Sequence, residues 1–151
     1  DMADTFRHYD DKMLFVKCAV DDYYYMVGGG VHLGETSDDC IEREVFEETG
    51  IHAEVQSIAV VSENFFKGFG GNIDGFDCHT IEFYYRMQIP DDDISLCKSV
   101  TDDGEKLVWL PIDEIRTSNI KPDFIKDNIE KILNERNIIH IIEEKGGYRL
   151  L

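Results

Sequence analysis

The sequence lacks several features that mark membrane-bound, secreted or metal-stapled proteins. No run in its 151 residues approaches the length of about 18 apolar residues that a membrane-spanning helix requires. Its four cysteines form no CxxC pair, which argues against a zinc knuckle and against a disulfide scaffold. The polar, charged stretch at residues 1–12 does not resemble a signal peptide. A reducing cytoplasm is therefore the simplest location, and we expect no membrane partner.

Positive charge is also scarce. The chain has 15 lysines and arginines against 32 aspartates and glutamates, which gives a formal net charge of −17. A protein this acidic is a poor general binder of phosphate backbones, so we expect no nucleic-acid partner. A phosphorylated substrate would need a divalent metal ion to screen the repulsion. The alternative is that the charge serves solubility only, and composition by itself favours that interpretation.

Proline is rare as well, with three residues, and the remaining composition is ordinary for a globular protein: 42% hydrophobic and 31% charged. The length suits one domain that can bury most of its apolar surface. No repeat, linker or low-complexity segment divides the sequence. We therefore expect a single domain over residues 1–151, with a mixed sheet and helices.

Apolar and β-branched runs predict the strands. We place them at residues 12–20, 23–27, 52–66, 79–89, 106–110 and 137–144. The first two should form a hairpin, and the third, which is long and kinked, should pair with the fourth. The glycines at 28–30 break the strand pattern, because consecutive glycines permit backbone geometries that other residues resist.

Capping residues bound the main predicted helix, at residues 38–49. Ser37 is a suitable N-cap, acidic residues occupy the favourable first turn, and Gly50 suits the position just after the last turn. A short helix is expected at 111–115 and an amphipathic one at 121–136.

Three glutamates crowd one face of the helix at 38–49. Glu44, Glu47 and Glu48 are related by spacings of three and four, so their like charges repel by a few tenths of a kcal/mol per pair. Ile41 and Val45 share another face, which should be the core side. A bound cation would offset the repulsion, and hard oxygen ligands of this kind suit Mg²⁺ or Mn²⁺ better than zinc.

The segment around this helix resembles the Nudix hydrolase signature, G-x5-E-x7-R-E-U-x-E-E-x-G-U, in which U is an aliphatic residue. Every specified position matches, at Gly29, Glu35, Arg43, Glu44, Val45, Glu47, Glu48, Gly50 and Ile51. From average residue usage, a chance match in a chain this long is on the order of one in ten million, and an acidic composition relaxes that value somewhat.

The resemblance implies both a fold and a reaction. Members of this family are α+β proteins with an α/β/α sandwich around a mixed β-sheet, and the signature forms a loop–helix–loop. They use water and a divalent metal ion to hydrolyse a nucleoside diphosphate linked to another moiety. The resemblance therefore implies Mg²⁺ as the cofactor, with Mn²⁺ as a substitute, and a small nucleotide as the partner. A homodimer is kept as an open alternative to a monomer.

Residue roles follow from the resemblance by position. Glu47 and Glu48 should be metal ligands, Glu44 a ligand or the base for the attacking water, and the carbonyl of Gly28 a further ligand. Arg43 should hold the carboxylates by ion pairing, together with Glu35. The residues assigned to catalysis are Glu44, Glu47, Arg43 and Glu105, and those assigned to the metal are Gly28, Glu44, Glu47 and Glu48.

Glu105 enters this set as a second candidate for the base. Some members of the family take the base from a downstream loop, and here Asp102, Asp103 and Glu105 precede the strand at 106–110. Glu63 and Glu82, on strands, are weaker options. The sequence departs from the family pattern at Val27, where proline is common. It departs again at 5–9, a short stretch where a full strand is usual.

The substrate is less well specified. Phe65, Phe66, Phe69 and His79 are the residues assigned to substrate binding, because aromatic side chains can stack on a base. A phenylalanine at strand spacing is more often a core residue. The glycine-rich segment 67–78 is either a flap over the substrate or an ordinary connection.

Two other functional classes stay open. A catalytically silent Nudix domain would bind a nucleotide for regulation, although the intact acidic triad argues against it. A Mg²⁺-dependent phosphatase would act on a monoester. Product analysis separates them, because a Nudix enzyme releases a nucleoside monophosphate from a diphosphate linkage.

Overall fold

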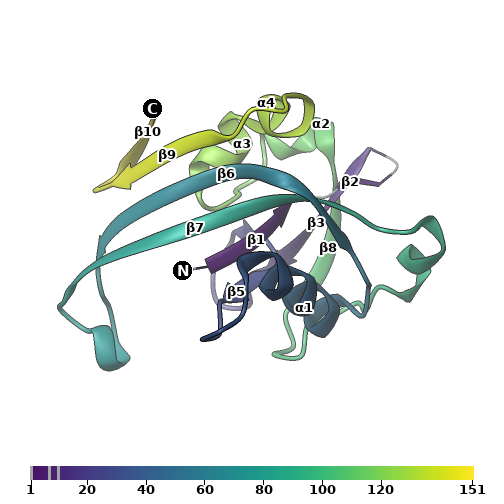
Figure 1. Cartoon of the computed structure of the whole chain (residues 1–151), viewed down its shortest axis with the longest axis horizontal. Coiled ribbons are helices and arrows are strands. Elements are labelled where there is room, and N and C mark those ends of the chain that lie inside the picture. Colours follow the sequence, from purple (N-terminus) through teal and green to yellow (C-terminus); the bar gives the residue numbers. More distant parts are fainter. Residues whose placement is uncertain (1, 7, 10) are drawn as a thin grey trace.

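The computed structural model describes residues 2–6, 8–9 and 11–151 and contains two β-sheets and several helices (Figure 1). The strands are β1 (Met2–Phe6), β2 (His8–Tyr9), β3 (Lys12–Lys17), β4 (Tyr24–Tyr25), β5 (Gly28–Gly30), β6 (Glu54–Lys67), β7 (Asp77–Gln88), β8 (Lys106–Pro111), β9 (Ile139–Glu144) and β10 (Gly147–Leu150). The α-helices are α1 (Ser37–Thr49), α2 (Ile112–Ile115), α3 (Asp123–Asp127) and α4 (Ile129–Asn134). Two 3₁₀ helices span Gly71–Ile73 and Asp91–Leu96. Within the described residues, no helix is long and apolar enough to cross a bilayer.

The larger sheet has the strand order β10-β9-β6-β7-β1-β5. Its pairs β1–β7 and β6–β9 are parallel and its other pairs are antiparallel, so the expected mixed sheet is confirmed. The predicted pairing of the third and fourth strands is confirmed as β6–β7, and two register shifts near Val55 and Ile58 produce the kink. A second sheet joins β2, β3 and β4, with β8 against β3, and contains the predicted hairpin.

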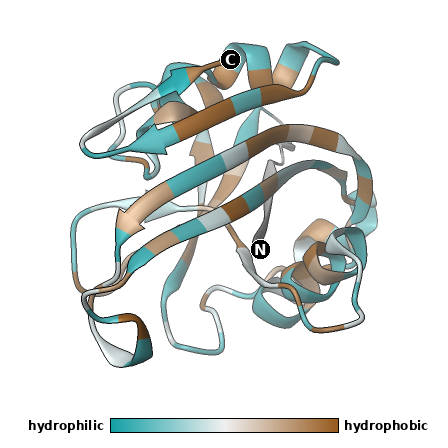
Figure 2. Ribbon diagram, turned by 60° about the vertical axis from the view of Figure 1, so that its left-hand side comes forward, coloured by the Kyte–Doolittle hydropathy of each residue, from teal (hydrophilic) through white to brown (hydrophobic). Residues whose placement is uncertain are grey.

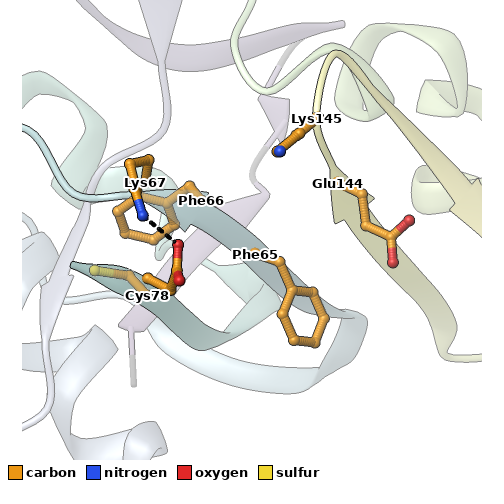
Figure 3. A pocket seen from close by; sticks show the side chains of 7 residues that line it. Phe65, Phe66, Lys67, Cys78, Glu144 and Lys145 are labelled. Atoms are coloured by element: carbon orange, nitrogen blue, oxygen red, sulfur yellow. Dashed lines mark hydrogen bonds and ion pairs between the residues drawn. The ribbon is translucent and has the colours of Figure 1, made fainter. Parts of the chain in front are cut away.

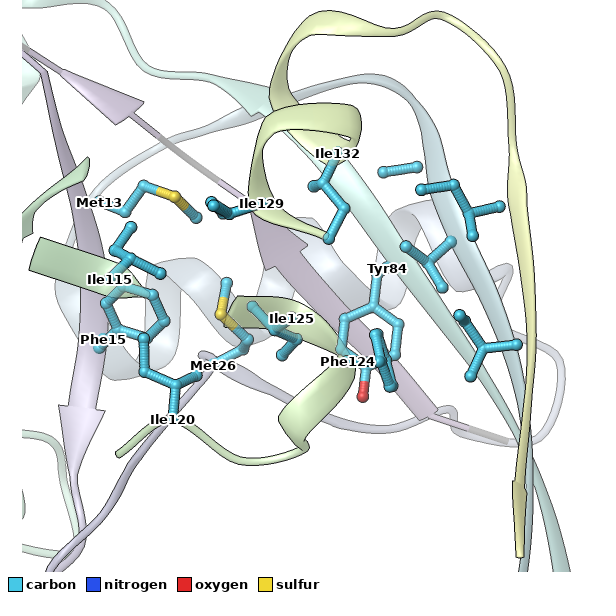
Figure 4. Close-up of a cluster of buried hydrophobic side chains, with 14 of the residues drawn as sticks. Met13, Phe15, Met26, Tyr84, Ile115, Ile120, Phe124, Ile125, Ile129 and Ile132 are labelled. Carbon is cyan, nitrogen blue, oxygen red and sulfur yellow. The ribbon is translucent and has the colours of Figure 1, made fainter. Parts of the chain in front are cut away.

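The two faces of the larger sheet pack against different helices. On one face, Tyr84 of β7 lies in a cluster with Phe124 and Ile129 of α3 and α4 (Figure 4). On the other face, Tyr85 packs with Ile41 and Val45 of α1. Hydrophobic and hydrophilic residues follow one another along β6 and β7 (Figure 2), as expected for strands with two distinct faces. Helices therefore cover both sides of the sheet, and the α/β/α arrangement is confirmed.

The N-terminal strand lies earlier in the chain than the sequence indicates. β1 begins at Met2 and lies between β7 and β5, whereas the expectation was a short strand at 5–9. Arg7, inside that expected range, lies outside the described residues. The prediction that the glycines at 28–30 break the strand pattern is wrong, because they form β5 and pair with β1. Pairing with a distant strand overrides the weak local preference of both segments.

Two predictions fail in the C-terminal part. The single helix at 121–136 is two helices, divided at Asn128, whose side-chain amide donates to the carbonyl of Phe124 over 2.9 Å. Such a local bond competes with regular helix bonds. The strand at 137–144 is not the last, because β10 follows a turn and pairs with β9.

Candidate active site

Helix α1 is fixed at both ends by its caps. Thr36 is the N-cap, because its hydroxyl accepts from the backbone N–H of Asp39 over 3.1 Å and donates to the Asp39 carboxylate over 2.8 Å. The choice of Ser37 was wrong by one residue, and the spacing of threonine and aspartate three apart was the available signal. At the other end Gly50 has φ 77°, and its N–H donates to Phe46, as predicted.

The orientation of α1 leaves its glutamates outside the core. Cys40, Ile41 and Val45 are buried against the sheet, which confirms the predicted core side. Glu44 and Glu48 are half-buried, and Glu47 is exposed. The polar face therefore presents three carboxylates at the surface.

Gly29 lies directly under one of these carboxylates. A Cβ atom built on Gly29 would stand 2.3 Å from Cδ of Glu44 and 2.4 Å from its Oε1 atom. No residue with a side chain fits there unless Glu44 moves. The β5 backbone and the helix carboxylate are thus in direct contact, which explains a glycine at this position of the signature.

Arg43 connects the carboxylates to one another. Its Nη1 atom donates to Glu44 over 2.7 Å and to Glu47 over 3.2 Å. Its Nε and Nη2 atoms donate to the two oxygens of Glu35 over 2.7 and 3.0 Å. Because a guanidinium has donors in a fixed plane, these bonds set the positions of three carboxylates together.

Glu35 anchors the loop before the helix. Its Oε2 atom accepts from the backbone N–H of His32 over 3.0 Å. The hydrogen bonds from Arg43, followed by the one from His32, lower the pKa of Glu35 to about 2. In turn, Glu35 and Glu44 raise the pKa of the Arg43 guanidinium. The structure thus contains the ion pairing that the resemblance implies.

Glu48 lies in a concentration of negative charge. Burial raises the pKa of its carboxyl, and the nearby charges of Asp103, Asp102 and Glu44 raise it further. The downstream acidic loop therefore reaches the same region as the helix. A cation placed here would be attracted by several carboxylates at once.

Lys98, which sequence reasoning missed, fastens that loop to the helix. Its Nζ atom donates to the carbonyl of Glu47 over 2.8 Å and to the Asp102 carboxylate over 3.0 Å. Its backbone N–H donates to the carbonyl of Thr49 over 2.8 Å. A cation near a helix C-terminus is favourable in general, but nothing in the local sequence links Lys98 to a helix 50 positions earlier.

Glu105 lies beside this loop with both oxygens engaged. Its Oε1 atom accepts from the backbone N–H of Ala19 over 2.9 Å, and its Oε2 atom accepts from the hydroxyl of Tyr25. Burial and this carboxylate together raise the pKa of Tyr25. Glu105 thus joins the β3–β4 hairpin to the start of β8.

The residues assigned to substrate binding lie on the β6–β7 hairpin, which extends past α1 (Figure 1). Phe65 and His79 stack, with ring centroids 4.1 Å apart and planes at 14°. Phe69 is 95% exposed in the connection between the strands. That connection is closed by its own backbone bonds, such as Gly68 N–H to Phe76 and Gly75 N–H to Gly68.

A cavity of about 670 Å³ opens at the end of this hairpin (Figure 3). It is lined by Phe65, Phe66, Lys67, Asp77, Cys78, Glu144 and Lys145. None of these residues belongs to α1, so the cavity and the helix carboxylates are separate features of the described chain.

The donor set of α1 fits a divalent cation. In the described part of the chain, no three histidine, cysteine, aspartate or glutamate side chains already converge as a metal-binding group. However, Glu44 and Glu47 accept from the same Arg43 nitrogen, so their carboxylates are neighbours. The crowding of charge around Glu48 gives a reason for a cation to bind. Carboxylate and carbonyl oxygens are the ligands that Mg²⁺ and Mn²⁺ prefer.

Comparison with known proteins supports one family. The NUDIX domain model matches residues 5–130. No curated protein matches the sequence of the chain. Among solved structures, a MutT protein from Bacillus halodurans has a TM-score of 0.72 at 17% identity, with coverage of 99% of this chain and 95% of that one. A NUDIX hydrolase from Nitrosomonas europaea has a TM-score of 0.67 at 17% identity, covering 94% and 78%.

A UDP-X diphosphatase has a TM-score of 0.62 at 20% identity, with coverage of 87% of this chain and 59% of that one. These likenesses concern the fold, whereas the family model matches most of the chain together with the signature residues on α1. The chain belongs to the Nudix family and is a hydrolase that acts on pyrophosphate bonds.

Proposed function

We propose that the protein is a Mg²⁺-dependent nucleotide pyrophosphohydrolase, with Mn²⁺ as a substitute. It hydrolyses a nucleoside diphosphate linked to another moiety, with water attacking a phosphorus of the diphosphate. The observation that carries this proposal is the contact between Gly29 and Glu44, with Arg43 joining Glu44 to Glu35 and Glu47. This arrangement brings several carboxylate oxygens close together. A metal ion bound to these oxygens would offset their repulsion of a diphosphate.

Glu44, Glu47 and Glu48 are the carboxylates that would hold the metal, together with the carbonyl of Gly28. When bound, Mg²⁺ supplies charge neutralisation for the diphosphate and acidifies water. The acidic residues alone would repel a phosphorylated substrate. Arg43 keeps the carboxylates in register, because it is bonded to Glu44 and Glu47 at once.

Glu44 is our proposal for the general base. Its carboxylate is oriented by Arg43 and by the β5 backbone, so its position is fixed before substrate binds. Removal of a general base costs about 10²–10⁴ in rate. Glu105 is the second proposal, and it would first have to release Tyr25 or Ala19.

The aromatic residues of the β6–β7 hairpin are our proposal for base binding. Phe65 and His79 stack on each other, and the outer faces of their rings are aromatic surfaces on which a base can stack. Phe66 lines the neighbouring cavity. The side chain of Phe69 is exposed, so a ligand can contact it. The UDP-X diphosphatase among the similar structures makes conjugates of uridine diphosphate suitable test substrates.

A turnover screen tests the proposal. Nucleoside triphosphates, nucleotide sugars, ADP-ribose and dinucleoside polyphosphates are each incubated with Mg²⁺ or Mn²⁺, and the products are identified. Release of a nucleoside monophosphate is expected from at least one substrate. Nucleotide binding without any turnover would favour a silent regulatory domain, and phosphate release from monoesters alone would favour a phosphatase.

A further inference from the structure

The turn at residues 101–105, just before β8, is closed by its own hydrogen bonds. The backbone N–H of Thr101 donates to the carbonyl of Glu105 over 2.8 Å, and the N–H of Gly104 donates to the carbonyl of Thr101 over 3.0 Å. The hydroxyl of Thr101, a buried side chain, accepts from the N–H of Glu105 over 3.2 Å. Gly104 has φ 84°, a left-handed conformation that favours glycine. Because these bonds are internal, the acidic turn 101–105 moves as one body.

On one side, Lys98 attaches this turn to α1 (Figure 1). The Nζ atom of Lys98 donates to the carbonyl of Glu47 and to the carboxylate of Asp102. The attachment brings the turn close to Glu48. Burial raises the pKa of the Glu48 carboxyl, and among the charges that raise it further, those of Asp103 and Asp102 have the largest effect. The turn thus adds negative charge to the face of α1 that we assign to the metal.

On the other side, the Glu105 carboxylate attaches the turn to the β3–β4 hairpin. Its Oε1 atom accepts from the backbone N–H of Ala19 over 2.9 Å, and its Oε2 atom accepts from the hydroxyl of Tyr25. Hydrogen bonds to an ionised acceptor are stronger than those between neutral groups. The turn is therefore restrained at two places, by α1 at Asp102 and by the hairpin at Glu105.

Tyr25 is a firm support for the second attachment. Its backbone pairs with Val16 of β3, and its ring packs against the core cluster that contains Ile41 of α1. The backbone of its neighbour Tyr24 is hydrogen-bonded to residues 119–121, on the other side of β4. Close-packed interiors resist displacement of a ring. The Tyr25 hydroxyl is therefore a donor in a fixed position.

We propose that Tyr25 is a positioning residue for the metal site of α1. It acts through Glu105, which holds the acidic turn in place. Asp102 and Asp103 then stay beside Glu48, and their charges increase the attraction of this face for a divalent cation. The inference rests on the proposed hydrolase function and adds a residue that sets how much Mg²⁺ the enzyme requires.

Tyr25→Phe tests the inference, because it removes the hydroxyl and keeps the ring that packs in the core. The Mg²⁺ concentration for half-maximal hydrolysis should rise by about threefold or more, since the turn and its charges are held less firmly. The rate at saturating Mg²⁺ should return to within about twofold of wild type. The rise in melting temperature that Mg²⁺ causes should also shrink, which is a measurement without turnover.

Tyr24→Phe is the matched control. It removes the same hydroxyl from the next residue of β4, whose ring packs in the other core cluster. Its Mg²⁺ titration should match wild type. The double variant Tyr25→Phe/Lys98→Met should raise the half-maximal Mg²⁺ concentration by more than the product of the two single effects. Each attachment still restrains the turn when only the other is lost, so the two changes are coupled.

Equal Mg²⁺ titrations for Tyr25→Phe and Tyr24→Phe would overturn the inference while the hydrolase function stands. So would a loss of rate in Tyr25→Phe that saturating Mg²⁺ does not restore, or single effects that simply multiply in the double variant. A wild type that hydrolyses no diphosphate would instead defeat the proposed function. The melting-temperature shifts of the two tyrosine variants with Mg²⁺ would then still decide whether Tyr25 supports the metal site.

Discussion

The carboxylate of Glu44 occupies the space that a side chain on Gly29 would need, with Cδ 2.3 Å from the position of a Cβ atom. The contact joins β5 to α1 at the centre of the candidate site. Glu44 is also bonded to Arg43, so a displacement at Gly29 would spread to the other carboxylates. This single contact therefore provides a selective way to disturb the site.

Gly29→Ala should leave the fold intact and lower hydrolysis at least tenfold. The end of the Glu44 side chain can move aside, so stability should change little, but the carboxylate would leave its place. Gly30→Ala is the matched control, since no atom lies within 4 Å of a Cβ built there. Steady-state rates and thermal melting of the two variants check this. Equal activity of both variants would mean that the position of Glu44 is unimportant.

Millimolar Mg²⁺ should raise the melting temperature of the wild-type protein. The charges around Glu48 disfavour its ionised form in the absence of metal, and a cation that binds only the folded state stabilises it by mass action. Glu48→Gln should raise the metal-free melting temperature and reduce the Mg²⁺ shift. NaCl at matched ionic strength is the control, because an equal shift from NaCl would indicate screening and not a site.

Glu35 should make the free energy of unfolding depend on pH below about 4.5. Its pKa is lowered from 4.5 to about 2 in the folded protein, so its contribution is present above pH 4.5 and is lost as the pH falls towards 2. Glu35→Gln should therefore be less stable than wild type at pH 7, and the difference should shrink between pH 4.5 and 2. Urea unfolding at several pH values measures this. A difference independent of pH would exclude the ion pair with Arg43 as its source.

Lys98→Met should loosen the attachment of the acidic loop to α1 and so raise the Mg²⁺ concentration that the enzyme needs. Methionine retains much of the aliphatic stem but cannot bond to Glu47 or Asp102. The loop would then be free to leave Glu48, and we expect a higher Mg²⁺ concentration for half-maximal rate. Lys98→Arg should recover part of the wild-type response. An unchanged Mg²⁺ titration in Lys98→Met would limit Lys98 to a structural role.

The sequence predicted the local features of the site well, because the signature residues are contiguous. The face shared by Glu44, Glu47 and Glu48, the core side at Ile41 and the cap at Gly50 all follow from helical spacing and capping chemistry. The N-cap was misplaced by one residue, since Thr36 and Ser37 are both good caps and only the bond to Asp39 distinguishes them.

Contacts between distant segments could not be predicted in the same way. Glu63 and His140 are 77 positions apart and meet because β6 and β9 are parallel neighbours. Lys98 reaches the end of α1 through the path of a loop. β1 was placed too late in the chain and β10 was missed, because their short sequences become strands only by pairing with β7 and β9.

Product analysis of wild type beside Glu48→Gln tests the central claim most directly. With a nucleoside diphosphate conjugate and Mg²⁺, the wild type should release a nucleoside monophosphate, and omission of the metal should abolish the reaction. Glu48→Gln keeps the volume of the side chain and removes a ligand charge, so it should lose most of this activity at limiting Mg²⁺ while its circular dichroism spectrum is unchanged. Wild-type turnover by Glu48→Gln at limiting Mg²⁺ would contradict the assignment of the α1 face as the metal site.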